Sequence, residues 1–177
     1  NYSQYYLPHG YKELFIPAKG PGKFHLEKHA LHIWPRGEQM LIALPNLDGS
    51  FTCTLFMPFE GETGSFAALS SPENARAFFE ETYPDALDLM PTFDADFAQN
   101  PTSSLVTVKC APWVYKGKVA LIGDASHAIV PFYGQGMNAG LEDCRIFAQC
   151  MAEGGDDWGS ILAAYEEERI DNANAIA

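Results

Sequence analysis

Apolar side chains in the first part of the chain recur at every second position or gather in short runs, a pattern typical of β-strands. The runs that show it are residues 11–16, 31–34, 40–44 and 51–57. Between the last two lies the sequence Asn46-Leu47-Asp48-Gly49, and an Asp-Gly pair favours the positive φ angles of a hairpin turn. The pattern therefore predicts a largely antiparallel sheet.

A helix is predicted next, because both of its ends carry recognisable residues. Ser71 can accept a hydrogen bond from a free backbone amide at a helix start, and Pro72 fits the first helical position. Pro84 ends the helix near Tyr83. Residues 85–104 carry no long periodic run, so we expect loop and short helix there.

The pattern changes in the second part of the chain. Residues 104–112 are typical of a strand, and the run at residues 119–122 contains no polar position. A strand that is apolar on both faces is typical of a sheet covered on both sides. Residues 137–153 and 158–177 then carry the helical period.

Length and composition fit a folded protein of mixed architecture. The chain has 177 residues, 47% of them apolar, which is enough for a substantial core. We expect an α/β (α+β) fold, with an antiparallel-rich sheet and one helix at residues 1–102 and part of an α/β domain at residues 103–177. The formal net charge of −12 argues against a nucleic-acid-binding face and against electrostatic membrane binding.

The four cysteines form no Cys-x-x-Cys pair; they stand at positions 53, 110, 144 and 150. Because Cys53 and Cys110 lie in strand-like apolar runs, we expect free buried thiols in a reducing, cytoplasmic compartment. The sequence contains no stretch of about 18 apolar residues that would span a bilayer. A membrane anchor of a longer parent protein, beyond residue 177, stays open.

The candidate chemistry lies between the apolar run and the helix that follows it. Gly123 ends the run, where a backbone without a side chain lets a ligand approach closely. Asp124 stands at the carboxyl end of the strand, the usual ligand side of an open α/β sheet, and its carboxylate can accept hydrogen bonds from sugar-type hydroxyls. The next helix starts near Gly136, where free amides favour a ligand that gains negative charge. A reduced flavin is such a ligand.

The stretch Gly123-Asp124-Ala125-Ser126-His127-Ala128, followed by Pro131 and Gly134-Gln135-Gly136-Met137-Asn138, resembles the second FAD fingerprint of class A flavoprotein monooxygenases. In that family the aspartate binds the ribityl chain, and the loop and helix start hold the isoalloxazine ring. The resemblance implies a glutathione-reductase-type FAD-binding domain with FAD as cofactor. The residues that it implicates in cofactor binding are Gly123, Asp124, Pro131, Gly134, Gln135, Gly136, Met137 and Asn138.

The β-rich part resembles one branch of that family, the kynurenine 3-monooxygenases. The resemblance rests on Pro8-His9-Gly10-Tyr11, Leu31-His32-Ile33-Trp34-Pro35-Arg36, Ile42-Ala43-Leu44-Pro45-Asn46 and Ser50-Phe51-Thr52-Cys53-Thr54-Leu55-Phe56-Met57-Pro58. In that branch the sheet forms a wall of the substrate pocket. By matching position, the resemblance implicates Leu31, Met40, Ile42, Leu44 and Phe56 in this wall, with Pro131, Phe132 and Gly134 closing the pocket and Tyr133 at its rim.

The resemblance implies an aromatic hydroxylase that converts L-kynurenine to 3-hydroxykynurenine in tryptophan catabolism. NADPH would be the reductant and dioxygen the second substrate. Because the cofactor carries such chemistry, no catalytic side chain is assigned, and no metal site is expected.

No Gly-x-Gly-x-x-Gly motif follows a strand in the sequence, so we expect the unit that binds the ADP half of FAD in a missing N-terminal segment of the same protein. The chain begins at Asn1 rather than at a methionine and ends in a helical run. We therefore expect a C-terminal piece of a longer enzyme, which by itself neither retains FAD nor catalyses the reaction.

Several alternatives stay open. The parent protein would be another class A hydroxylase, or the isolated chain would be a folded module without catalytic activity. The positions assigned to the substrate wall would instead be ordinary core residues. A zinc site at His25, His29 and His32 is disfavoured, because no further ligands accompany them. A hydrolase built on Ser126 and His127 is disfavoured, because they lie outside a Gly-x-Ser-x-Gly elbow.

Overall fold

The computed structural model describes the backbone of residues 1–177 and every side chain except that of Tyr133. The chain forms two compact units. The sheet unit comprises Leu7–Ser104, and the helical unit comprises Asn1–Tyr6 together with Leu105–Ala177. The sequence suggests a boundary between residues 102 and 103 that separates a substrate-binding part from an FAD-binding part, and this boundary stays a prediction.

The main sheet is mostly built from strands close together in the sequence. Its first four strands are β1 (Tyr2–Ile16), β2 (His32–Arg36), β3 (Gln39–Pro45) and β4 (Phe51–Pro58). With β5 (Thr102–Cys110) and β8 (His127–Ala128), the spatial order is β2-β3-β4-β1-β5-β8. Strands β1 to β4 pair antiparallel. The four predicted strands are confirmed, although β1 begins at Tyr2, well before the predicted start at residue 11.

The hairpin between β3 and β4 turns where the sequence predicts it. The amide of Asn46 donates to the carbonyl of Ser50 at 2.8 Å, and Gly49 has a φ of +98°. A positive φ is costly for residues that carry a Cβ, so glycine suits this position.

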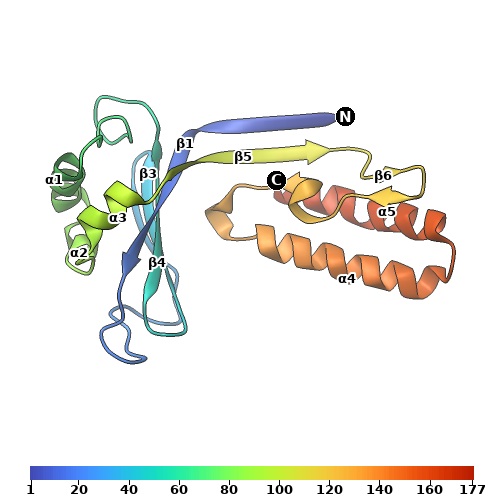
Figure 1. Cartoon of the computed structure of the whole chain (residues 1–177), viewed down its shortest axis with the longest axis horizontal. Helices are drawn as coiled ribbons and strands as arrows, with labels where there is room; N and C mark the ends of the chain where they lie inside the picture. The colour runs from blue at the N-terminus through green and yellow to red at the C-terminus, as the bar shows by residue number, and fades with distance from the viewer. The chain divides into compact units, whose positions relative to one another are not determined.

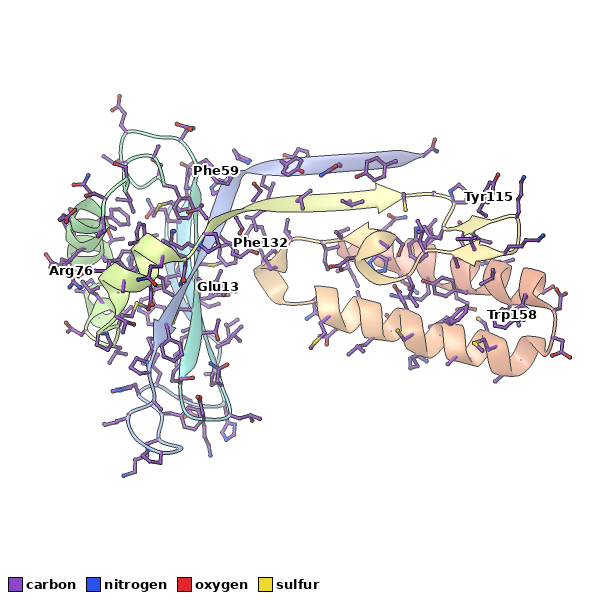
Figure 2. All side chains as sticks on the ribbon, viewed as in Figure 1. Glu13, Phe59, Arg76, Tyr115, Phe132 and Trp158 are labelled. Atoms are coloured by element: carbon purple, nitrogen blue, oxygen red, sulfur yellow. The ribbon has the colours of Figure 1, made fainter. Side chains whose placement is uncertain are left out.

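Three helices cover one face of β1, β3 and β4, as Figure 1 shows. They are α1 (Pro72–Thr82), α2 (Pro84–Leu87) and α3 (Phe93–Gln99). Ser71 caps α1 as predicted, since its hydroxyl accepts from the amide of Asn74 at 3.2 Å. Arg76 of α1, labelled in Figure 2, ties α1 to α3 by donating to both carboxylate oxygens of Asp94 at 2.8 and 2.9 Å.

The two faces of the sheet differ in what packs on them. The face toward the helices supplies the core of the sheet unit, which includes Leu14, Leu41, Ala43, Leu55, Met57, Phe79 and Phe93. The register pairs Met40 with Phe56 and Phe56 with Tyr11. Because successive side chains of a strand point to opposite faces, these residues share the face that the three helices do not cover.

The helical unit is dominated by α4 (Gly136–Gly154) and α5 (Trp158–Ile176), which lie side by side in Figure 1. Both helices are predicted correctly from the sequence. Shorter elements precede them: the hairpin strands β6 (Val114–Tyr115) and β7 (Val119–Ala120), and the 3₁₀ turns η1 (Gly123–Ala125) and η2 (Pro131–Tyr133). A core cluster of Trp113, Cys150, Ile161, Tyr165 and Ala173 holds the unit together.

The prediction for residues 119–122 is wrong. Only Val119–Ala120 form a strand, β7, and it pairs antiparallel with β6. Val119 is 56% exposed and Ile122 is 40% exposed, so the run is not buried on both faces. A short strand is covered only by the elements that pack on it, and β6 is the only strand paired with β7 in the part of the chain that the structure describes.

Candidate functional site

The Gly123–Asp124 motif forms a tight turn in the helical unit. Gly123 has a φ of +62°, and a Cβ placed on it would meet no atom within 4 Å. Its amide donates to Asp143 Oδ2 at 2.9 Å, while its carbonyl accepts from the amide and the hydroxyl of Ser126 at 2.9 and 2.8 Å. The turn is therefore fixed on both sides of Gly123, and it leaves the Asp124 side chain exposed.

The loop that follows also needs a glycine in the left-handed region. Gly134 ends η2 with a φ of +62° and leads into α4, whose N-cap is Gln135. The side chain of Gln135 does not cap the helix; instead its Oε1 accepts from Asn138 Nδ2 at 3.3 Å. The first amides of a helix have no partner within the helix, so the start of α4 favours negative charge.

The body of α4 packs on the Gly123 turn within the helical unit. A Cβ placed on Gly140, in α4, would lie 3.8 Å from the Cα of Gly123, and Asp143 of the same helix holds the Gly123 amide. The exposed carboxylate of Asp124 and the open space at Gly123 therefore stand beside the helix that Gly136 begins. The binding roles of Gly123, Asp124, Pro131, Gly134, Gln135, Gly136, Met137 and Asn138 stay predictions.

The predicted substrate wall lies in the sheet unit. Met40, Ile42, Leu44 and Phe56 share the face away from α1 to α3, and Leu31 immediately precedes β2. Ile42 and Phe56 are 5% and 3% exposed, yet neither belongs to the core cluster of the sheet unit. Leu31 and Leu44 are each 46% exposed. Substrate contact at these positions stays a prediction.

The residues predicted to close the pocket lie in the other unit. Pro131, Phe132 and Gly134 belong to η2 and its end, and Figure 2 labels Phe132 on this segment. The pocket role that the sequence suggests for them stays a prediction. The side chain of Tyr133, expected at the pocket rim, lies outside the described residues.

A buried charged cluster behind the Gly123 turn is missed by the sequence analysis. Asp143 and Arg169 are 0% and 1% exposed, and His127 is 2% exposed. The sequence of α5 does indicate that Arg169 is buried. Arg169 lies four positions after Tyr165 and four before Ala173, both of which are buried. That spacing places Arg169 on the buried face of the helix.

Tyr165 supports the segment just before the Gly123 turn. Its hydroxyl donates to the carbonyl of Leu121 at 3.2 Å. Burial raises the pKa of Tyr165, which keeps the hydroxyl protonated and able to donate.

The remaining sequence expectations concern metals, thiols and membranes. All four cysteines are free, but Cys144 is exposed and Cys110 only half-buried, so the expectation that all thiols are buried is wrong. In the described part of the chain, no group of three or more His, Cys, Asp or Glu residues is placed to hold a metal ion. Across the same residues, no helix has both the length and the hydropathy that crossing a bilayer requires.

Comparison with curated proteins gives relatives along the whole chain. The kynurenine 3-monooxygenase of Flavobacterium psychrophilum is 63% identical over 177 residues, which is all of this chain and 39% of that protein. The kynurenine 3-monooxygenase of Flavobacterium johnsoniae is 58% identical, again over all of this chain and over 40% of that protein. The chain thus spans about two fifths of the length of these relatives.

Comparison with solved structures gives the same fold. Klebsiella pneumoniae HpxO, in its complex with FAD and uric acid, matches with a TM-score of 0.69 and 16% identity, over 99% of this chain and 44% of that chain. A family model described as an FAD binding domain matches residues 88–177, just over half of the chain. The chain therefore belongs to the FAD-binding domain family.

Proposed function

We propose that the protein containing this chain is an FAD- and NADPH-dependent monooxygenase that hydroxylates L-kynurenine to 3-hydroxykynurenine. One observation carries the proposal: a chain that aligns over its whole length with relatives named kynurenine 3-monooxygenase also folds residues 123–138 into a turn and helix start that suit a flavin. The ADP half of the cofactor would be bound by a segment outside these 177 residues.

In this proposal Asp124 binds the ribityl chain of FAD. Its carboxylate is exposed, and hydrogen bonds from hydroxyls to a carboxylate are stronger than those between neutral groups. The start of α4 stabilises the negative charge that the ring gains on reduction, by roughly 0.3–1 kcal/mol at an exposed helix end. The start of the helix thereby favours the reduced form of the cofactor, and no charged side chain is needed for this effect.

The wall residues would hold and shield the substrate ring. When bound, FAD supplies the oxidation chemistry, with NADPH as reductant and dioxygen as the oxygen source. Met40, Ile42 and Phe56 can neither donate nor accept a proton, so their contribution is to orient an aromatic ring and to exclude water. The proposal needs no acid or base from this wall.

The proposal extends to partners and location. The partner of this chain would be an N-terminal segment of the same protein. Four free thiols suit a reducing compartment, which favours the cytoplasm.

Product analysis on the full-length protein tests the proposal. The purified protein is supplied with FAD, NADPH and L-kynurenine. Parallel reactions contain phenolic acids in place of L-kynurenine. We expect 3-hydroxykynurenine to form in proportion to the NADPH consumed. Hydroxylation of another aromatic ring, with L-kynurenine left unchanged, would contradict the proposal and favour a different class A hydroxylase.

A further inference from the structure

Three side chains that no binding role explains meet in the interior of the helical unit. Asp143 Oδ1 accepts from Arg169 Nε at 2.7 Å, and Asp143 Oδ2 lies 2.6 Å from His127 Nε2. The guanidinium of Arg169 also donates to Glu142 Oε2 at 2.7 Å and to the carbonyl of Ala139 at 3.3 Å. Buried charges are tolerated when they are paired and hydrogen-bonded, and this cluster meets both conditions.

The donors around Asp143 require a carboxylate at this position. Its two oxygens face three donors: Arg169 Nε on one oxygen, and the Gly123 amide and His127 Nε2 on the other. An amide side chain offers only one acceptor oxygen and would turn its NH₂ group toward a donor. A carboxylate at Asp143 suits this contact when His127 Nε2 is the ring nitrogen that carries the hydrogen.

His127 is itself held in place. It belongs to β8, which pairs with β5, and its ring packs against Trp113 with ring centroids 5.2 Å apart. The cluster therefore joins β8, α4 and α5 at one carboxylate. That carboxylate also receives the Gly123 amide, the backbone group directly before the exposed Asp124.

We propose that Asp143, oriented by His127 and Arg169, is the positioning residue that sets the direction of the Gly123 turn and thereby of the Asp124 carboxylate. The inference rests on the proposed role of Asp124 in flavin binding. A purely structural role, in which the cluster only joins α4 to α5, predicts a loss of stability without a change in how the folded protein binds flavin.

The test uses three variants of the full-length protein. His127→Phe keeps a ring against Trp113 but removes the donor to Asp143. Asp143→Glu keeps the charge opposite Arg169 but moves the carboxylate by one methylene away from its present position. Ile161→Val is the matched control, because it removes one methyl group from the core of the same unit, in α5.

Each variant is measured as folded apoprotein in three ways: thermal unfolding, the dissociation constant for FAD, and the visible circular dichroism of bound flavin. For His127→Phe and Asp143→Glu we expect the FAD dissociation constant to rise on the order of tenfold, the size expected for loss of one buried hydrogen-bond partner. We also expect an altered dichroism of the flavin. For Ile161→Val we expect a lower unfolding temperature with unchanged flavin binding.

Two results would overturn the inference. One is a normal dissociation constant and normal dichroism in both cluster variants, with only the unfolding temperature lowered. The other is failure of both variants to fold, which would show that the cluster holds the whole unit. Asp124→Ala in the same assay separates this inference from the proposed function: normal FAD affinity there refutes the binding role of Asp124, whatever the cluster variants do.

Discussion

Gly123 adopts a backbone conformation that residues with a Cβ rarely take. Its φ of +62° lies in the left-handed region, and a Cβ there would meet no atom within 4 Å. Gly123→Ala should therefore cost only the backbone strain of a non-glycine residue, about 1–2 kcal/mol. Chemical denaturation of the apoprotein measures this loss in the free energy of unfolding.

Gly136 offers a matched control for that prediction. It begins α4 with an ordinary negative φ, and a Cβ there would make normal contact with Ile129 at 3.9 Å. Gly136→Ala should leave stability unchanged or raise it by about 0.4–1 kcal/mol, because alanine loses less backbone entropy on folding. Equal destabilisation by the two substitutions would contradict the strain assigned to Gly123.

Sequence patterns identify some of these residues and miss others for a physical reason. Gly123, Asp124 and Gly134 stand within the short stretch 123–138, so local sequence is enough to single them out. The cluster of His127, Asp143 and Arg169 draws on three elements, and its existence depends on how they pack. A sequence pattern indicates which positions of a helix are buried, but it does not indicate which charged side chain of another element will pair with a buried residue.

The sheet between residues 31 and 58 presents different side chains on its two faces. Phe56 lies on the face away from the helices, whereas Phe51 of the same strand is part of the core. Phe56→Leu in the full-length enzyme should raise the share of NADPH oxidation that ends as hydrogen peroxide, because a smaller side chain admits water. Peroxide and hydroxylated product are measured together.

Phe51→Leu is the control for that experiment. It makes the same substitution on the core face, so it should lower stability by about 1–2 kcal/mol through the cavity that it leaves, and it should leave the coupling unchanged. Unchanged coupling in Phe56→Leu would mark Phe56 as plain packing and would remove the support for a substrate wall.

The elements also show where sequence patterns succeed and fail. β3, β4, α1, α4 and α5 carry their own signals, such as the Ser71 cap and the helical period, and all are predicted within a few residues. The first half of β1 carries no clear alternation, so its pairing depends on neighbouring strands rather than on its own pattern. The prediction for residues 119–122 is wrong although the pattern is clear. The pattern is that of a buried strand, but burial requires elements packed on both faces.

At the scale of the whole molecule, the chain is expected to fold without keeping its cofactor. It belongs to the FAD-binding domain family, but it spans only about two fifths of the length of its curated relatives. A partial set of contacts must still offset the entropy lost when a ligand binds. The purified chain of 177 residues should therefore be colourless after gel filtration, as measured by flavin absorbance. A yellow protein with stoichiometric flavin would contradict this expectation.

Asp124→Ala in the full-length protein shows whether the Gly123–Asp124 turn and the start of α4 hold a flavin. Asp156→Ala, which removes another exposed carboxylate of the helical unit, is the control. We expect the FAD dissociation constant of Asp124→Ala to rise roughly ten- to a hundredfold, since hydrogen bonds to a charged group contribute about 1.5–3 kcal/mol. The thermal unfolding of the apoprotein should stay the same. Equal FAD affinity in Asp124→Ala, Asp156→Ala and the unmodified protein would show that the Asp124 carboxylate does not hold the flavin.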